Sequence, residues 1–325
     1  MAPLLRRTEE REETQPPQCV VYGLVRWISG RTARLMIMNS VGSTFRIYVL
    51  GLRLGLLHVL RAQIRRGIYL LIRPMDYWRT LEFPIALEYL LPVPGERILD
   101  VGSPKLISMY IATRCNAHVY AMDIYDDGGL TDTLFYTSST GTDTLHVLTG
   151  DVRELPFADS SLDKVFSISV LEHVFPAEGG DVKALKEIAR VLRPAGRLVF
   201  TVPFTRQSRV DYLKQDVYDR KRMTTEEMVF YQRRYDAHSL QTLLAAGDEF
   251  EVERQEYICE RFYHRPKKEL WSIIGEGNKF KRLALAPLYP VFALIFLKRS
   301  STPLPASDSM AVCMSLRKKQ RTNTP

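Results

Sequence analysis

Apolar residues occur in short runs from residue 97 onward, and stretches with helical spacing separate the runs. Runs rich in β-branched and aromatic residues predict buried strands at residues 97–101, 118–122, 145–149, 164–168 and 197–202. Before the last of these, apolar residues recur at helical spacing from 182 to 192, and Pro194 and Gly196 end the helix. Strands that alternate with helices predict an α/β fold: a doubly wound, mostly parallel sheet with helices on both faces.

The C-terminal part adds a predicted helix at residues 237–246 and strands at 250–258 and 310–316, which brings the sheet to seven strands. Between those two strands, the apolar run 283–297 contains Pro287 and Pro290 and is bracketed by lysines and arginines. Such a segment suits a membrane interface better than a membrane span. We therefore predict a main domain at residues 81–318 with an insertion at 259–309, followed by a tail at 319–325.

The N-terminal part concentrates the positive charge of a chain whose net charge is +8. No acidic residue occurs between Glu13 and Asp76, although arginine is frequent there. We predict a disordered tail at residues 1–18 and a basic, apolar helical extension at 19–80. The longest apolar run of the extension, residues 47–60, is interrupted by Arg53 and is shorter than the roughly 20 residues that span a bilayer. The extension is expected to cover the main domain or to lie against an anionic membrane surface.

Nucleic acid is the other anionic partner that this charge allows. The basic stretch has few lysines, and the sequence contains no recognisable RNA-binding module, which argues against RNA methylation and against nucleic acid as a partner.

The four cysteines are far apart and form no CxxC pair, at Cys19, Cys115, Cys259 and Cys313. This spacing is poor material for a metal site or a disulfide framework, so we predict no metal. The absence of a disulfide framework favours a reducing compartment. We therefore predict that the protein is cytoplasmic, with a peripheral contact to a membrane.

Three acidic residues stand at the ends of consecutive predicted strands: Asp100, Asp123 and Asp151. In an open parallel sheet, ligands bind beyond the carboxyl ends of the strands. Asp123 lies 21 residues beyond Gly102, the spacing expected of a carboxylate that binds both hydroxyls of a ribose. Asp151 then suits an adenine amino group. For Asp123 and Asp151, the alternative explanation is solvated turn residues. For Asp100, the alternative is that it orients the loop and does not contact a ligand.

A series of motifs extends this pattern over residues 80–260 and the final strand. In order, they are residues 97–103 (RILDVGS), 121–123 (AMD), 150–157 (GDVRELPF), 161–165 (SLDKV), 169–173 (SVLEH) and 191–196 (VLRPAG). Together they resemble the class I S-adenosylmethionine-dependent methyltransferases, close to the branch that modifies small molecules and lipids.

The resemblance implies S-adenosylmethionine as the cofactor and a place for each motif. Cofactor-binding residues would be Asp100, Gly102 and Ser103 at the methionine part, Asp123 and Ile124 at the ribose, Asp151 and Val152 at the adenine, and Ser169 near the sulfonium. The Leu-Glu-His segment is similar to that of ubiquinone-pathway O-methyltransferases, which places Glu172 and His173 near the transferred methyl group as catalytic candidates.

The glycine-rich turn departs from the family's pattern. Pro104 and Leu106 stand where the second and third glycines are expected. Proline has no N–H and fixes φ, so the turn offers fewer donors to the cofactor carboxylate. Lys105 or Arg79 could supply positive charge instead.

The acceptor end of the site is less defined by the sequence. His173 suits a general base that removes a hydroxyl proton near neutral pH, or it caps a helix and shapes the pocket. Tyr212 and Arg233 are candidates for substrate binding, and the alternative for the aromatic and basic cluster at 230–236 is an exposed helix start.

The leading hypothesis is therefore an enzyme, a methyltransferase that acts on an oxygen of a small-molecule or lipid-linked acceptor near a membrane surface. Carbon and nitrogen acceptors stay open, because nothing in the sequence identifies the nucleophile. A methyltransferase-like scaffold without catalysis is the main alternative, because of the altered turn. A nicotinamide-dependent oxidoreductase needs a G-x-G-x-x-G turn, which no strand end here supplies.

Overall fold

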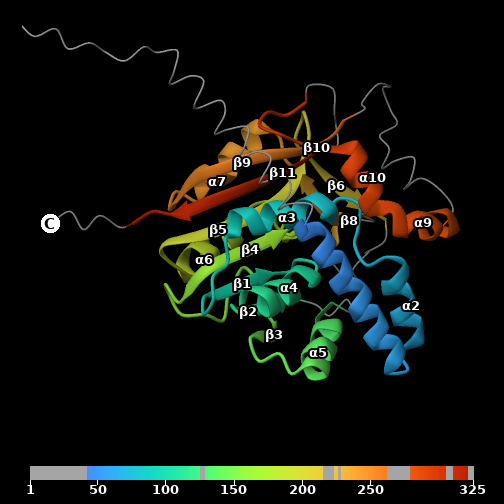
Figure 1. Ribbon diagram of the computed structural model, residues 1–325. Helices are drawn as coiled ribbons and strands as arrows, with labels where there is room; N and C mark the ends of the chain where they lie inside the picture. The colour runs from blue at the N-terminus through green and yellow to red at the C-terminus, as the bar shows by residue number, and fades with distance from the viewer. Residues whose placement is uncertain are drawn as a thin grey trace, which may run out of the picture.

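The computed structural model describes residues 42–124, 129–214, 223–225, 228–261, 279–304 and 310–320. An eight-stranded sheet forms the centre of the molecule, in the order β10-β9-β11-β5-β4-β1-β2-β3 (Figure 1). Its parallel half consists of β1 (Arg97–Val101), β2 (His118–Asp123), β3 (Leu145–Thr149), β4 (Leu162–Ile168) and β5 (Leu192–Phe204). All five strands predicted from the apolar runs are confirmed.

Strand β1 is the point where the chain reverses its direction across the sheet. It pairs in parallel with β2 on one side and with β4 on the other. The chain first builds outward from β1 through β2 to β3, and then returns to β4 and β5. The crevice at such a reversal is the usual ligand site of a doubly wound sheet.

Helices cover both faces of the sheet, as predicted. One core cluster joins the sheet to α3 (Arg79–Leu90), α4 (Leu106–Cys115) and α5 (Gly129–Thr140). The other cluster joins it to α6 (Gly180–Val191) and α7 (Ala237–Ala246). These two apolar layers fix the register of the strands, because a slip by one residue would move core residues to the wrong face.

The far edge of the sheet is antiparallel and has one strand more than the seven predicted. Strands β9 (Phe250–Glu260) and β11 (Met310–Lys318) were expected, and β10 (Leu297–Ser300) adds to β9. The apolar run 283–297 supplies α9 (Lys279–Leu285), η2 (Ala286–Leu288) and α10 (Tyr289–Phe296), and its last residue begins β10. Arg299 in β10 pairs with Glu256 and Glu88, contacts distant in sequence that no local pattern reveals.

A three-stranded sheet of order β6-β8-β7 lies beside the main one. It consists of β6 (Arg209–Leu213), β7 (Met223–Thr225) and β8 (Met228–Arg234). The cluster at 230–236 is therefore mostly strand. The helix begins only after Asp236, whose carboxylate caps α7 by accepting from the backbone N–H of Ser239.

The N-terminal extension forms a helical hairpin, the Gly42–Leu60 helix followed by α2 (Ile64–Ile72). The two helices touch where Gly55 faces Gly67: a Cβ on Gly67 would lie 2.7 Å from the carbonyl oxygen of Gly55. Only glycine permits this approach. Ile47 and Leu54 join the same core cluster as α3 and the sheet, so the hairpin covers the main domain. The predicted tail at 1–18 and residues 19–41 of the extension lie outside the described residues.

The Gly42–Leu60 helix is long and apolar enough to cross a membrane by length and composition alone, contrary to the estimate from the run 47–60. The share of its apolar window that is buried inside the protein is 39%. Such a helix is also common in the core of soluble proteins, so this finding by itself is weak evidence for a membrane span.

Candidate functional site

A cavity of about 510 Å³ opens beyond the carboxyl ends of β1, β2 and β4. Of the residues predicted to bind the cofactor, those that line it are Gly102, Ser103, Asp123, Ile124, Asp151, Val152 and Ser169. His173 lines it as well, whereas Asp100, Glu172, Tyr212 and Arg233 do not. The volume falls in the usual range for small-molecule sites.

The turn after β1 is built around Gly102. Its φ is +64°, and a Cβ there would lie 2.8 Å from a methyl group of Val170. Its N–H donates to the carbonyl of Met122 at 2.8 Å, which ties the turn to β2. The hydroxyl of Ser103 accepts from the backbone N–H of Ile168 at 2.9 Å and so ties the turn to β4. The turn stays tight although Pro104 replaces a glycine.

Asp100 is fully buried and orients this turn instead of facing the cavity. Its carboxylate accepts from the N–H of Ser103 at 2.9 Å, the hydroxyl of Ser108 at 2.5 Å and the ammonium of Lys105 at 3.2 Å. The expectation that Asp100 contacts a ligand is corrected by this geometry, since the buried carboxylate is occupied by protein donors.

Lys105 lies between two strand ends. Its ammonium donates to the carbonyl oxygen of Met122 at 3.0 Å and lies 3.9 Å from the carboxylate of Asp123. The side chain is 4% exposed. Lys105 therefore neutralises Asp100 and holds Asp123 in place.

Asp123 and Asp151 face the same cavity from neighbouring strand ends. Their side chains keep 17% and 27% of their surface exposed. One oxygen of Asp123 accepts from the N–H of Ile124 at 2.8 Å, which fixes the carboxylate at the end of β2. Four aspartates line the cavity, and two of them, Asp123 and Asp151, stand at neighbouring strand ends; the others are Asp76 and Asp132.

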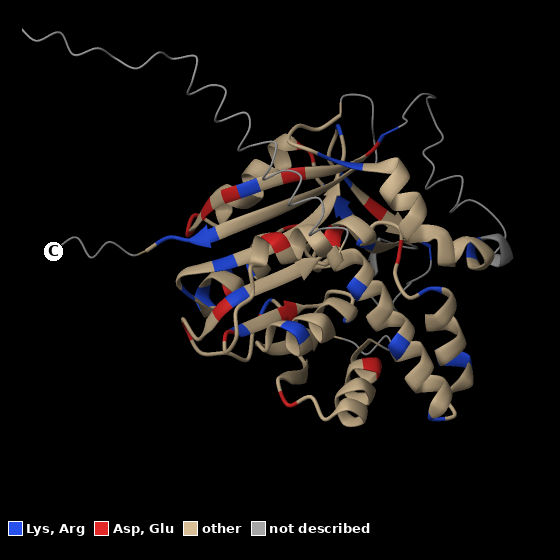
Figure 2. Cartoon of the chain, viewed as in Figure 1, with Lys and Arg blue, Asp and Glu red and all other residues tan. Residues whose placement is uncertain are grey.

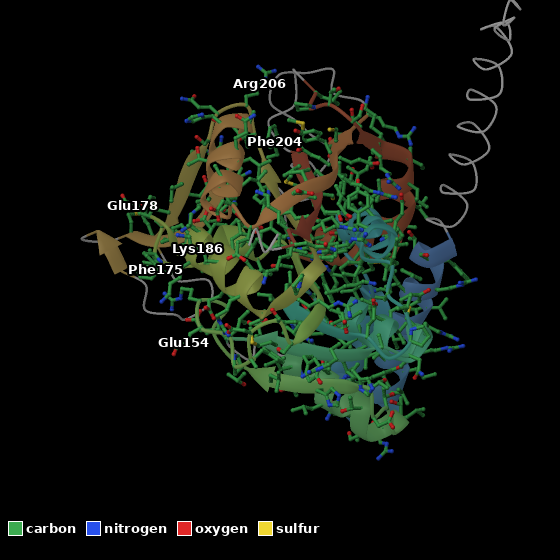
Figure 3. The ribbon with its side chains drawn as sticks, turned by 90° about the vertical axis from the view of Figure 1, so that its left-hand side faces the viewer. Glu154, Phe175, Glu178, Lys186, Phe204 and Arg206 are labelled. Atoms are coloured by element: carbon green, nitrogen blue, oxygen red, sulfur yellow. The ribbon has the colours of Figure 1, made fainter. Side chains whose placement is uncertain are left out.

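Arg153 is a cavity residue that the sequence did not single out. Its Nε lies 3.0 Å from both oxygens of Asp151, and its guanidinium also donates to the carbonyl of Phe175 at 2.8 Å. Partial burial raises the pKa of Asp151, but the hydrogen bonds from Arg153 outweigh it and lower the pKa below the ordinary value. Arg153 thus connects its own loop to the loop that contains Phe175. Figure 3 labels Glu154 of the first loop and Phe175 of the second.

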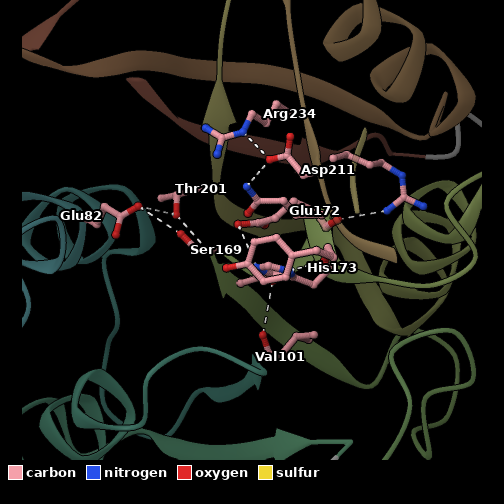
Figure 4. A network of polar contacts seen from close by, with 12 residues as sticks. Glu82, Val101, Ser169, Glu172, His173, Thr201, Asp211 and Arg234 are labelled. Atoms are coloured by element: carbon pink, nitrogen blue, oxygen red, sulfur yellow. Dashed lines mark hydrogen bonds and ion pairs between the residues drawn. The ribbon is translucent and has the colours of Figure 1, made fainter. Parts of the chain in front are cut away.

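A second polar cluster lies at the end of β4 (Figure 4). The guanidinium of Arg79 donates to the hydroxyl of Ser169 at 2.8 Å and pairs with Glu82. Glu82 is buried and accepts from the hydroxyl of Thr201 at 3.0 Å. Arg79 and Ser169 line the cavity, so the cluster presents a cation there.

His173 is held in one tautomer. Its Nδ1 lies 2.7 Å from the carbonyl oxygen of Tyr231, and because a carbonyl only accepts, Nδ1 carries the proton. In the neutral ring the lone pair is then on Nε2. His173 is thus a cavity residue with a basic nitrogen.

Glu172 lies next to His173 (Figure 4) and is not a cavity residue. One carboxyl oxygen lies 3.9 Å from His173 Nε2, and the other has no hydrogen-bond partner. Burial raises the pKa of Glu172 to about 8, so this carboxyl group keeps its proton to a higher pH than an exposed glutamate does. This geometry argues against the expected place of Glu172 beside the reacting atoms.

Arg233 and Tyr212 do not form an acceptor pocket with this cavity. Arg233 is buried and donates to the carbonyls of Glu172, Val174, Pro176 and Ala177. Its donors are used to hold the loop after His173, so the substrate role expected of Arg233 is corrected. Tyr212 is 37% exposed in β6, where its ring packs edge-on against Phe230.

The hairpin supplies a wall that the sequence did not predict. Leu54, Tyr69 and Leu70 line the cavity on an apolar side. Arg66 of α2 bonds Asp132 of α5 through Nε at 3.0 and 3.1 Å, and both residues line the cavity. In the described residues, no group of three or more potential metal ligands occurs.

Residues 99–200, which contain most of these strand ends, match a family model described as a methyltransferase domain. This segment is a methyltransferase domain. Beyond this segment, the sheet order β3-β2-β1-β4-β5 continues with antiparallel β11 and β9. Among solved structures, the MccD protein aligns with a TM-score of 0.48 at 14% identity, over 73% of this chain and 96% of that one. The doubly wound fold is therefore assigned from the strand order of this chain and not from this alignment.

Curated methyltransferases resemble about a third of this chain. The O-methyltransferase rstn1 of Aspergillus nomiae is 35% identical over 112 residues, which covers 34% of this chain and 48% of the relative. The demethylmenaquinone methyltransferase of Clavibacter sepedonicus is 34% identical over 130 residues, with 38% and 50% covered. The probable tRNA methyltransferase 9B of Mus musculus is 39% identical over 124 residues, with 38% and 25% covered. The chain spans half or less of each relative, and their names differ in the acceptor.

Proposed function

We propose that this chain transfers a methyl group from S-adenosylmethionine to an oxygen of a small-molecule or lipid-linked acceptor. The observation that carries the proposal is that Asp123 and Asp151 line one cavity at the reversal point of the sheet. Two carboxylates on neighbouring strand ends suit a nucleoside, one at its sugar and one at its base.

The donors and acceptors around the cavity fit the whole cofactor. Asp123 accepts from the ribose hydroxyls, and Asp151 with the backbone of Val152 receives the adenine. Arg79 supplies positive charge for the methionine carboxylate, the role left open by the missing glycines of the turn. Arg153 orients Asp151 in this arrangement.

S-adenosylmethionine, when bound, supplies a methyl group on a sulfonium whose sulfur leaves as a neutral thioether. The protein aligns the acceptor oxygen with this group and excludes water. His173 accepts the hydroxyl proton at Nε2, while the bond from Nδ1 to the carbonyl of Tyr231 stabilises the imidazolium that forms. The acceptor oxygen thus loses a proton as it gains a carbon.

We also propose that the reaction takes place near a membrane surface, in a protein of the cytoplasm. The support is the acid-free, arginine-rich sequence of the hairpin and the apolar helices η2 and α10. Both suit a peripheral contact.

Comparative mass spectrometry tests the reaction. Extracts of cells with and without the protein should differ in a compound that gains the mass of one CH₂ group, and an isotopically labelled methyl group should appear in it. The His173→Ala protein should not restore the product at the same rate. Absence of any methylated product, with cofactor binding intact, would favour the non-catalytic scaffold.

A further inference from the structure

We propose that the hairpin and the helices α9, η2 and α10 form one docking surface for an anionic lipid bilayer. The methyl acceptor is then an amphiphile whose polar head reaches the cavity while its tail stays in the bilayer. The acceptor part of this inference rests on the proposed function; the docking surface has its own evidence.

Both segments expose large apolar side chains. On η2 and α10, Leu288, Val291 and Ile295 are 46%, 51% and 50% exposed, while Tyr289 and Ala293 on the opposite side are buried. On the hairpin, the exposed large apolar residues are Phe45, Leu56, Leu60, Ile64, Ile68 and Tyr69. Contiguous apolar surface of this kind marks an interaction site.

The charge of the two segments is complementary to an anionic surface. Residues 42–75 and 279–304 contain no Asp or Glu. Figure 2 shows basic but no acidic positions along the two hairpin helices. Exposed arginines lie among their apolar side chains, at Arg46, Arg53, Arg61 and Arg65. Arginine with apolar neighbours on one side of a helix is typical of helices that lie in a membrane interface.

The two segments are contiguous in space although more than 200 residues separate them in sequence. The hydroxyl of Tyr48 donates to the carbonyl of Pro287 at 3.5 Å, and the guanidinium of Arg73 lies 5.9 Å from the ring centre of Tyr289. Figure 1 shows the hairpin, α9 and α10 on the same side of the sheet. They can therefore meet one planar surface together.

The hairpin is anchored to the protein, which favours a helix lying on the bilayer over one that crosses it. Ile47, Leu54 and His58 follow one buried side of the Gly42–Leu60 helix. His58 Nε2 lies 3.3 Å from Asp132, which also pairs with Arg66. A helix with one side on the protein and arginines on the other does not present an apolar surface all round.

The same hairpin separates the bilayer side from the cavity. Leu54 and Leu70 form the cavity wall together with Tyr69, which is also 42% exposed, while Leu56, Leu60 and Ile68 are exposed and do not line the cavity. An apolar wall suits the part of an amphiphile next to its reacting head, and the exposed residues suit its tail. A membrane-resident acceptor needs no passage through water in this arrangement.

Vesicle flotation tests the docking surface on the full chain. We expect the chain to float with phosphatidylcholine vesicles that contain phosphatidylserine, and less with phosphatidylcholine alone. Leu294→Glu with Ile295→Glu should lower the partition constant at least tenfold, and Arg53→Gln with Arg61→Gln should lower it about fivefold per arginine on anionic vesicles. Val252→Glu is the matched control, because Val252 is 51% exposed in β9 and should leave flotation unchanged.

Calorimetric titration of each variant with S-adenosylmethionine separates the possible failures. Unchanged cofactor binding shows that a variant is folded, so that its loss of flotation reports on the surface. If the wild-type chain binds the cofactor but does not float with anionic vesicles, the docking surface and the membrane location are wrong, while the proposed methyl transfer stands. If the chain bound RNA through the same arginines but did not float with vesicles, the assignment of this surface to lipid would be wrong. Flotation without cofactor binding would instead contradict the proposed function.

Discussion

The ammonium of Lys105 lies 3.2 Å from the carboxylate of Asp100 and donates to the carbonyl of Met122, so one buried lysine joins the ends of β1 and β2. It stands between Pro104 and Leu106, the positions at which glycines were expected. The chain thus replaces a flexible, donor-rich turn by a charged contact inside the protein. The turn remains in place beside Asp123, the carboxylate proposed for the ribose.

Removal of this lysine charge should cost both stability and affinity. Lys105→Met leaves Asp100 buried and unpaired, which should lower the free energy of unfolding by about 3 kcal/mol. Because Asp123 also loses its neighbouring cation, the Kd for S-adenosylmethionine should rise. Chemical denaturation and calorimetry measure the two effects. Lys186→Met, at an exposed position of α6, is the control and should change neither. Equal stability of both variants would show that the buried contact contributes nothing.

Glu172 predicts a pH dependence of stability. Burial raises its pKa from 4.5 to about 8, so the folded chain binds more protons than the unfolded chain between these values. The stabilisation is full below pH 4.5 and is lost as the pH rises through about 8, with a slope on the order of 1 kcal/mol per pH unit. Glu172→Gln should flatten the curve, as urea denaturation at a series of pH values would show. Glu178→Gln changes an exposed residue of the following loop and is the control. Its free energy of unfolding should depend on pH with the same slope as that of the wild type.

His173→Ala should lower turnover about a hundredfold at neutral pH if Nε2 accepts the proton. The KM for S-adenosylmethionine should change little, because the proposed cofactor ligands are other residues. The rate of the variant should also lose the rise with pH that a titrating base gives. Initial rates with the unmethylated form of the compound identified in extracts check this, and His238→Ala, at an exposed histidine, is the comparison. Nearly full turnover of the His173→Ala protein would remove the base role.

Arg233→Lys tests whether the residue holds the loop or the acceptor. A lysine cannot donate to four carbonyls in a plane, so the free energy of unfolding should fall by about 2 kcal/mol. The KM for the acceptor should stay within a factor of two or so of the wild type. A large rise in this KM with unchanged stability would restore the acceptor-binding role that the contacts of Arg233 argue against.

The sequence predicted the elements whose pattern is local. The strands at 97–101 and 145–149 and the helix at 237–246 have the predicted bounds, because each is a short apolar run between turn residues. The aspartates at the strand ends follow from the same pattern. A parallel sheet brings the ends of adjacent strands to one edge, so the pattern predicts that Asp123 and Asp151 share a site.

What the sequence missed depends on contacts between distant segments. Strand β10 contains only Leu297–Ser300 and is recognisable through its pairing with β9. Arg233 looked like a free cation because its four carbonyl partners lie more than 50 residues away. The cavity wall made by Leu54 and Tyr69 depends on how the hairpin packs, which the spacing of its apolar residues does not specify.

Calorimetric titration of the wild-type chain and its Asp123→Asn variant with S-adenosylmethionine tests the central claim most directly. The account predicts one site per chain and a Kd at least about tenfold higher for the variant, since a charged acceptor of two hydroxyl donors is lost. Circular dichroism should show the same fold for both. No binding by the wild-type chain at millimolar cofactor, or equal affinity of the two proteins, would contradict the account.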